Sequence, residues 1–128
     1  MRYPIKISNN LPFIKVLLNH KGRNMTLNNV LIDTGSANSI FKEEKVKEIG
    51  VKPEANDKLG TIRGVGGTEF VYIKNIDYIS IGEVTVENFK VDIGEMDYGI
   101  NLDGIIGVDF LMETKMIINL FENYLEFK

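Results

Sequence analysis

The stretch VLIDTGSA, residues 30–37, carries an apolar run straight into a carboxylate and then into small residues only. Its first three residues are typical of a buried strand, and Gly35 allows a sharp turn at no steric cost. Asp33 is therefore expected at a strand end, where the hydroxyls of Thr34 and Ser36 can orient it. A carboxylate held there can act as a general acid or base. Because Asp-x-Gly clusters also form ordinary polar turns, the stretch alone leaves both interpretations open.

The segments around this stretch predict a mostly β chain, because branched and aromatic residues recur in short runs between turn residues. Asn19–Asn24 is expected to be a loop of several residues, Asn88 an irregularity, and Glu122-Asn123 a two-residue turn. The expected strands are Leu11–Asn19, Met25–Ile32, Lys58–Arg63, Glu69–Ile81, Glu83–Ile93, Gly104–Gly107, Lys115–Phe121 and Tyr124–Phe127.

Two short helical segments interrupt this pattern. Lys42–Ile49 spaces its apolar residues for one helical face and is followed by Gly50, a typical helix C-cap. Val108–Glu113 is long enough for one or two turns, and Gly94–Asp103 before it is an acidic loop. We therefore expect an all-β, barrel-like or folded-sheet domain with one or two short helices.

Length and composition exclude several classes of protein. The 128 residues fit one compact domain, residues 1–128, and their net charge of 15 − 18 = −3 suits nucleic acid poorly. The chain has no cysteine and one histidine, which argues against disulfides, thiolate zinc, a thiol nucleophile and multi-histidine metal sites. We expect no membrane span, no secretory signal and a cytoplasmic location, since long apolar segments are missing.

A second feature is the glycine-rich segment Gly64-Val65-Gly66-Gly67, which lies between two expected strands. Three glycines in four positions let a backbone approach a ligand closely, as the tip of a lid over a substrate must do. A plain hairpin turn is the simpler interpretation. A phosphate-binding loop is excluded, because the GxxxxGK[ST] pattern is missing and no helical pattern follows.

A third feature is a weak internal repeat, called the internal echo below. Ile105-Ile106-Gly107 repeats the arrangement of Leu31-Ile32-Asp33, with two apolar residues entering a sharp turn before a short segment. The second copy has Gly107 where the first has Asp33. One chain would therefore hold one catalytic carboxylate rather than two.

The order and spacing of these three features resemble the retropepsin-like aspartic proteases, the single-domain, dimeric relatives of retroviral proteases, over roughly residues 11–128. The resemblance implies a closed β fold in which two subunits each donate one Asp-Thr-Gly loop. It implies an aspartic endopeptidase, a homodimer acting on peptides, with no metal and no cofactor. The alternative is a non-catalytic β-domain that serves as a binding or assembly module.

The resemblance also implies roles for individual residues. Asp33 would be catalytic, Thr34 would brace the opposing loop, Gly35 would offer a backbone contact, and Ser36 would hydrogen-bond the outer oxygen of Asp33. The flap that binds substrate would have its tip at Gly64, Val65, Gly66 and Gly67. Packing beneath the catalytic loop would come from Ile105 and Ile106, followed by Gly107.

The sequence departs from the retroviral pattern in three places. Val108-Asp109-Phe110 stands where retroviral members usually have Arg or Asn, so an Arg–Asp salt bridge under the site does not carry over. A charged insert lies around Lys42–Lys58. In retroviral members the chain ends interleave in a sheet between the two subunits, and the resemblance does not establish this for the C-terminal hairpin Lys115–Lys128.

Other chemistries fit the sequence less well. A Ser–His–Asp arrangement would need His20, which we expect to be a solvated loop residue. An EF-hand beginning at Gly99 fails, because its first position is glycine and its twelfth is Phe110.

Overall fold

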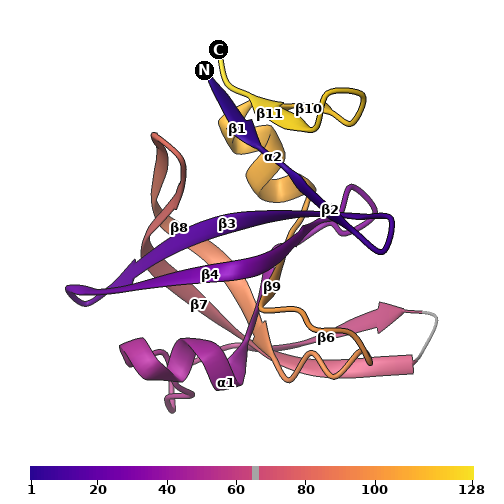
Figure 1. The fold of residues 1–128 in the computed structure, drawn as a ribbon. Helices are drawn as coiled ribbons and strands as arrows, with labels where there is room; N and C mark the ends of the chain where they lie inside the picture. Colours follow the sequence, from indigo (N-terminus) through magenta and orange to yellow (C-terminus); the bar gives the residue numbers. More distant parts are fainter. Residues whose placement is uncertain (65–66) are drawn as a thin grey trace.

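The computed structural model describes residues 1–64 and 67–128 and is built mainly from strands (Figure 1). Two short α-helices and one 3-10 turn accompany them: α1 at Glu43–Val46, the turn η1 at Lys47–Ile49, and α2 at Val108–Thr114. The strands are β1 (Arg2–Pro4), β2 (Lys6–Ser8), β3 (Leu11–His20), β4 (Arg23–Ile32), β5 (Ile40–Lys42), β6 (Leu59–Gly64), β7 (Gly67–Ile81), β8 (Val84–Gly94), β9 (Gly104–Ile106), β10 (Ile117–Asn119) and β11 (Tyr124–Glu126).

The larger of two sheets has eight strands in the order β2-β3-β4-β9-β5-β8-β7-β6. It closes on itself because β3 pairs not only with β4 but also with β7, at Leu17–Asn19 opposite Tyr78–Ser80. Among the strands of the described residues, only two pairings are parallel, β4 with β9 and β5 with β8. The chain therefore forms the closed, mostly β fold that the sequence predicts.

The two chain ends form a second sheet of three strands, β1-β11-β10, which lies with α2 at one end of the molecule (Figure 1). Beyond β1, the amino group of Met1 donates to the carbonyl of Phe127 at 3.0 Å. The amide of Phe127 donates to the carbonyl of Met1 at 2.8 Å. Within one chain, the terminal strands thus already satisfy much of each other's backbone hydrogen bonding.

The main core lies inside the closed sheet and continues beneath α2. Val16 and Leu18 of β3 are fully buried, whereas Leu17 between them is 40% exposed, which is the alternation expected of a strand with one buried face. Phe110 anchors α2 by an edge-to-face contact with Phe89, with ring centroids 5.3 Å apart. No helix in residues 1–64 and 67–128 is long and apolar enough to cross a membrane.

Several local expectations are confirmed. Gly50 ends η1 with a left-handed φ of 85°, and α2 occupies the segment expected to be helical. Asn88 has a φ of 50° and does not pair with Asp77 opposite it, although the register of β7 with β8 is the same on both sides. The irregularity predicted there is a local break in the pairing, without a change of register.

Other expectations were wrong in detail. The β3–β4 connection is a two-residue turn, Lys21-Gly22, rather than a longer loop, because both residues adopt the positive φ that tight hairpins require. The C-terminal turn is longer than predicted and spans residues 120–123. The strands β1, β2 and β5 were missed, because each has only three residues and so short a strand carries almost no periodic signal.

Leu18→Ala should lower the free energy of unfolding by about 2–5 kcal/mol, because it leaves a cavity at a fully buried position. Leu17→Ala, its neighbour on the exposed face, should cost about 1 kcal/mol or less. Urea unfolding of both variants measures the difference. Equal losses would contradict the assignment of the two faces of β3.

Candidate active site

Two parallel strands deliver the Asp33 loop. Leu31 of β4 pairs with Ile105 of β9, and Ile32 pairs with Ile106. The amide of Asp33 then donates to the carbonyl of Ile106 at 3.0 Å, so the parallel pairing continues to the turn itself. Both strands end at the same level, Asp33 after one and Gly107 after the other, as the internal echo predicts.

A backbone amide of the turn after β4 holds the Asp33 carboxylate in place. Oδ1 of Asp33 accepts a hydrogen bond from the amide of Gly35 at 2.9 Å, and the amide of Ser36 donates to the Asp33 carbonyl at 3.1 Å. A Cβ at position 35 would lie 3.1 Å from Oδ1, tighter than ordinary van der Waals contact. The Asp-x-Gly spacing therefore lets the backbone reach the carboxylate, which stays partly exposed to solvent.

The Ser36 hydroxyl, which was expected to orient Asp33, bonds to a different group. Oγ of Ser36 donates to the carbonyl of Asn38 at 2.7 Å, so it closes its own loop instead of binding the outer oxygen of Asp33. Thr34 is exposed on the same turn. The predicted Ser36–Asp33 bond was wrong because the chain folds back at Asn38, which brings a nearer acceptor to Ser36.

Ser39 and Asp109 lock this loop to α2, and the sequence reasoning missed both roles. Oγ of the fully buried Ser39 donates to Oδ1 of Asp109 at 2.8 Å and accepts from the amide of Gly107 at 3.0 Å. The amide of Ser39 donates to the other Asp109 oxygen at 3.0 Å. Asp109 thus accepts the hydrogen bonds of Ser39 at the place where retroviral members have an Arg–Asp salt bridge, which the sequence predicts to be missing here. An acidic residue in the first turn of a helix was the available signal.

Gly107 is required by close packing between the two loops. A Cβ there would lie 2.7 Å from the carbonyl oxygen of Ser36 and 2.8 Å from backbone atoms of Asn38. The amides of Val108 and Asp109 donate to the carbonyls of Ser36 and Ala37, at 2.8 and 3.2 Å. The loop after β9 therefore supports the Asp33 loop through backbone contacts as well as through Ser39 and Asp109.

Ile105 and Ile106 face opposite sides of β9. Ile106 is fully buried in the main core, beneath the Asp33 loop. Ile105 instead belongs to a second, smaller cluster, here named the floor cluster, which the partly buried Phe13, Leu31 and Ile62 flank. The floor cluster consists of Ile40, Val71, Met96, Leu102 and Ile105.

The segment predicted to be a flap belongs to the hairpin of β6 and β7. Gly64 pairs with Gly67, while Val65 and Gly66 lie outside the described residues. Of its arms, Val71 belongs to the floor cluster and Ile62 packs against it, whereas Phe70 is 80% exposed. Below the tip, the carboxylate of Glu69 accepts from the amide of Met96 at 2.7 Å and from the hydroxyl of Tyr98. Burial, with the bonded Glu69 carboxylate, raises the pKa of Tyr98, so this phenol stays protonated.

His20 is not the solvated loop residue that the sequence suggested. It ends β3, and only 7% of its surface is exposed, because the Lys21-Gly22 turn is tight and keeps it within the sheet. Since β4 returns for ten residues from this end to Asp33, the two side chains lie on the order of 30 Å apart. A Ser–His–Asp site that includes Asp33 is therefore excluded.

Comparison with known proteins agrees with this geometry. A family model described as aspartyl protease matches residues 16–110, which is most of the chain. The chain belongs to the aspartyl protease family. Among curated protein sequences, none matches significantly.

Solved structures of aspartyl proteases have the same fold. A retropepsin-like aspartic protease from Rickettsia conorii superposes with a TM-score of 0.70 at 17% identity, covering 98% of both chains. EIAV protease, in complex with the inhibitor HBY-793, superposes with a TM-score of 0.64 at 20% identity. That match covers 88% of this chain and 95% of EIAV protease. The fold of this aspartyl protease family member is therefore retropepsin-like.

Besides Asp109, another carboxylate, that of Asp92, lies near the loop of this family member. The amide of Asp92 in β8 donates to the carbonyl of Ser39 at 3.0 Å. Burial, together with the nearby Asp109 carboxylate, raises the pKa of Asp92, and Lys90 opposes that rise. Asp92 therefore favours its neutral form more than an ordinary aspartate does, which limits repulsion with Asp109.

Ser39→Ala should lower the free energy of unfolding by about 1–3 kcal/mol, because it leaves the buried Gly107 amide without its acceptor. Ser8→Ala, the same change at an exposed position, should be nearly neutral. Urea unfolding of the two variants gives the comparison. A neutral Ser39→Ala would show that this hydroxyl does not hold the two loops together.

Proposed function

We propose that this chain is an aspartic endopeptidase whose site forms when two copies each contribute one Asp33. The observation that carries the proposal is Asp33 itself, a partly exposed carboxylate held by the Gly35 amide at a rigid strand end. Family membership and the retropepsin-like fold support it. Each chain has one Asp-Thr-Gly loop, so one subunit supplies half of a two-carboxylate site.

Two carboxylates about 3 Å apart cannot both ionise comfortably, so they share one proton. The ionised member takes a proton from a water molecule, and that water attacks the peptide carbonyl. The protonated member polarises the carbonyl oxygen. The apparent titration belongs to the pair rather than to either Asp33. No covalent acyl-enzyme is needed for this reaction.

The surface of the chain supports association on the side that carries the Asp33 loop. The loop after β4 and the β10–β11 turn lie toward the same side of the molecule (Figure 1). The β10–β11 turn carries Leu120 and Phe121, and Phe121 is 94% exposed. A large apolar side chain left in water favours burial against a partner. We therefore place the contact between copies at this turn, beside the strands that pair within each chain.

A peptide substrate would bind in extended form beside the hairpin. β6 is the last strand of the larger sheet, so its outer edge can pair with an added strand. Ile62 of the hairpin is partly buried against the floor cluster of Val71 and Ile105, so it offers an apolar side chain to such a peptide. The enzyme would therefore hold the peptide by its backbone and select it through apolar side chains.

Asp33→Asn should reduce hydrolysis of a denatured protein at mildly acidic pH by at least 10²–10⁴-fold, roughly the contribution of one general acid or base. Folding should be intact, because the amide oxygen can still accept from the Gly35 amide. Cleavage is followed by mass spectrometry of the products, and folding by circular dichroism. Asp97→Asn, an exposed carboxylate, is the matched control and should retain activity.

If the purified protein cleaves nothing between pH 4 and 8, the alternative of a non-catalytic binding or assembly module is favoured. If Asp33→Asn cleaves as fast as the unmodified chain, the site assignment is wrong even though an activity exists.

Phe121→Asp should shift the chain from dimer to monomer and remove activity at concentrations where the unmodified chain is active. A charge at this position opposes burial against a second copy. Sedimentation velocity measures the shift. Leu59→Asp, also at a highly exposed apolar residue but on β6, should remain dimeric. A Phe121→Asp variant that stays dimeric and active would show that the contact between copies does not involve this turn.

A further inference from the structure

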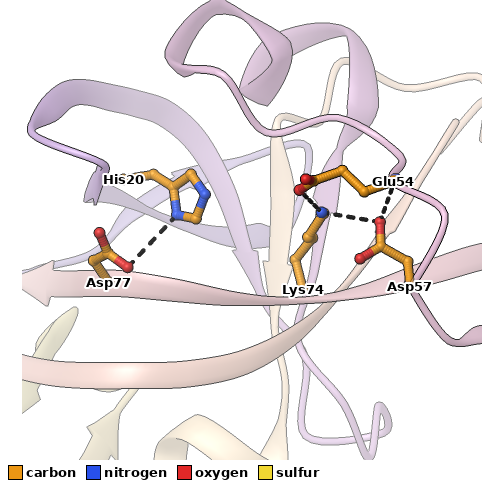
Figure 2. Close-up of polar contacts among 5 residues, drawn as sticks. All are labelled: His20, Glu54, Asp57, Lys74 and Asp77. Atoms are coloured by element: carbon orange, nitrogen blue, oxygen red, sulfur yellow. Dashed lines mark hydrogen bonds and ion pairs between the residues drawn. The ribbon is translucent and has the colours of Figure 1, made fainter.

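A buried lysine with two carboxylates lies at the root of the β6–β7 hairpin (Figure 2). Nζ of Lys74 is 2.6 Å from Oε1 of Glu54 and 2.9 Å from Oδ2 of Asp57. The Lys74 side chain is 8% exposed and that of Asp57 14%, while Glu54 is about half exposed. A buried ammonium is costly unless it is paired, so both contacts are needed to keep Lys74 charged inside the fold.

The two carboxylates belong to the loop that leads into the hairpin. The loop spans residues 50–58, between η1 and β6, and makes its own turn. The amide of Glu54 donates to Oδ2 of Asp57 at 2.7 Å, and the amide of Asp57 donates to the carbonyl of Glu54 at 3.1 Å. At its end, the amide of Ile73 donates to the carbonyl of Lys58 at 2.9 Å. The loop is therefore fastened to β7 immediately before β6 begins.

Lys74 separates two parts of β7 that pair with different strands. From Gly67 to Tyr72 it is the second arm of the hairpin, paired with β6. From Tyr78 to Ser80 it is part of the closed sheet, paired with β3. Lys74 lies between these parts, where the hairpin leaves the body of the sheet. Val71 of the arms belongs to the floor cluster together with Ile105, and Ile62 packs against it. The root is therefore the point from which these arms extend over the cluster.

We propose that Lys74 is a positioning residue for substrate: through Glu54 and Asp57 it fixes the root of the β6–β7 hairpin and hence the arms against which a peptide binds. This inference rests on the proposed peptidase function for its role in substrate binding. The anchoring of the hairpin itself does not depend on that function.

The electrostatics of the cluster support a lasting clamp. Burial acts to lower the pKa of Lys74, but its two carboxylate partners outweigh burial and raise it. The hydrogen bond from Lys74 also lowers the pKa of both Glu54 and Asp57. Carboxylates with lowered pKa values stabilise the fold above their ordinary pKa, and this stabilisation is lost as the pH falls through the lowered values. The clamp therefore persists at the mildly acidic pH that suits a shared-proton site.

A neighbouring pair bounds the cluster on the β3 side (Figure 2). Nδ1 of the buried His20 lies 3.9 Å from Oδ1 of Asp77, too far for a hydrogen bond. Oδ2 of Asp77 accepts from the amide of Lys21 at 2.8 Å. Burial lowers the pKa of His20, and the nearby Lys21 and Lys74 lower it further, against Asp77 and Glu54. His20 therefore adds little positive charge beside Lys74 near neutral pH.

The test compares Lys74→Met with Lys74→Arg in the full chain. Methionine keeps much of the apolar stem but removes the charge, whereas arginine can restore both ion pairs. Lys15→Met, an exposed lysine of β3, is the matched control for the change of charge. Amide hydrogen exchange is measured peptide by peptide. Peptide hydrolysis is then measured to separate KM from kcat.

In Lys74→Met we expect exchange at least about tenfold faster in residues 50–64 and 67–73, with β4, β9 and the terminal sheet unchanged. KM should rise severalfold with a smaller change in kcat, because the arms bind peptide but supply no reacting group. Lys74→Arg should restore most of both effects.

Unchanged exchange at the hairpin root, or faster exchange spread evenly over all strands, would overturn the proposal. A rise in exchange at the root without any change in KM would show that Lys74 anchors the hairpin without positioning substrate. If the unmodified chain hydrolyses no peptide, the proposed function fails, and the exchange data still decide whether the clamp exists.

Discussion

The parallel pairing of β4 with β9 is the constraint on which the site depends. It ends in the hydrogen bond from the Asp33 amide to the Ile106 carbonyl, so a carboxylate and a glycine turn stand at the same level. Parallel strands need a long crossover between them, and here the intervening chain builds β5 to β8, including the hairpin. One pairing therefore places the carboxylate and brings the hairpin arms to the floor cluster beside it.

Around that pairing, the protein supports Asp33 with backbone and buried polar contacts. The Ser39 hydroxyl joins the Gly107 amide to the Asp109 carboxylate, and Gly107 is small enough for the two loops to touch. Farther out, Lys74 is held between Glu54 and Asp57 where the hairpin begins. Polar groups buried in this way cost free energy if they lose a partner, so each restricts the conformations of the loop or hairpin that it joins.

Much of this was readable from the sequence. Asp33 at a strand end, the Ile105-Ile106-Gly107 echo and the glycine-rich hairpin are local patterns with direct physical meaning, and the fold follows from them. The partners of Ser39, Asp109 and Lys74 could not be predicted, because they lie between 17 and 70 residues away in the chain, although the place of Asp109 in the first turn of a helix was a signal. His20 and Ser36 were misjudged for a related reason, since local turn geometry decided their surroundings.

The central claim is that one Asp33 becomes competent only beside a second Asp33 from another copy. Mixing unmodified subunits with an equal amount of Asp33→Asn subunits tests it most directly, once exchange between dimers is complete. Random pairing leaves half of the unmodified subunits in mixed dimers, so activity per unmodified chain should fall to about half. Activity per unmodified chain that does not change on mixing would contradict the account, because a single Asp33 would then suffice.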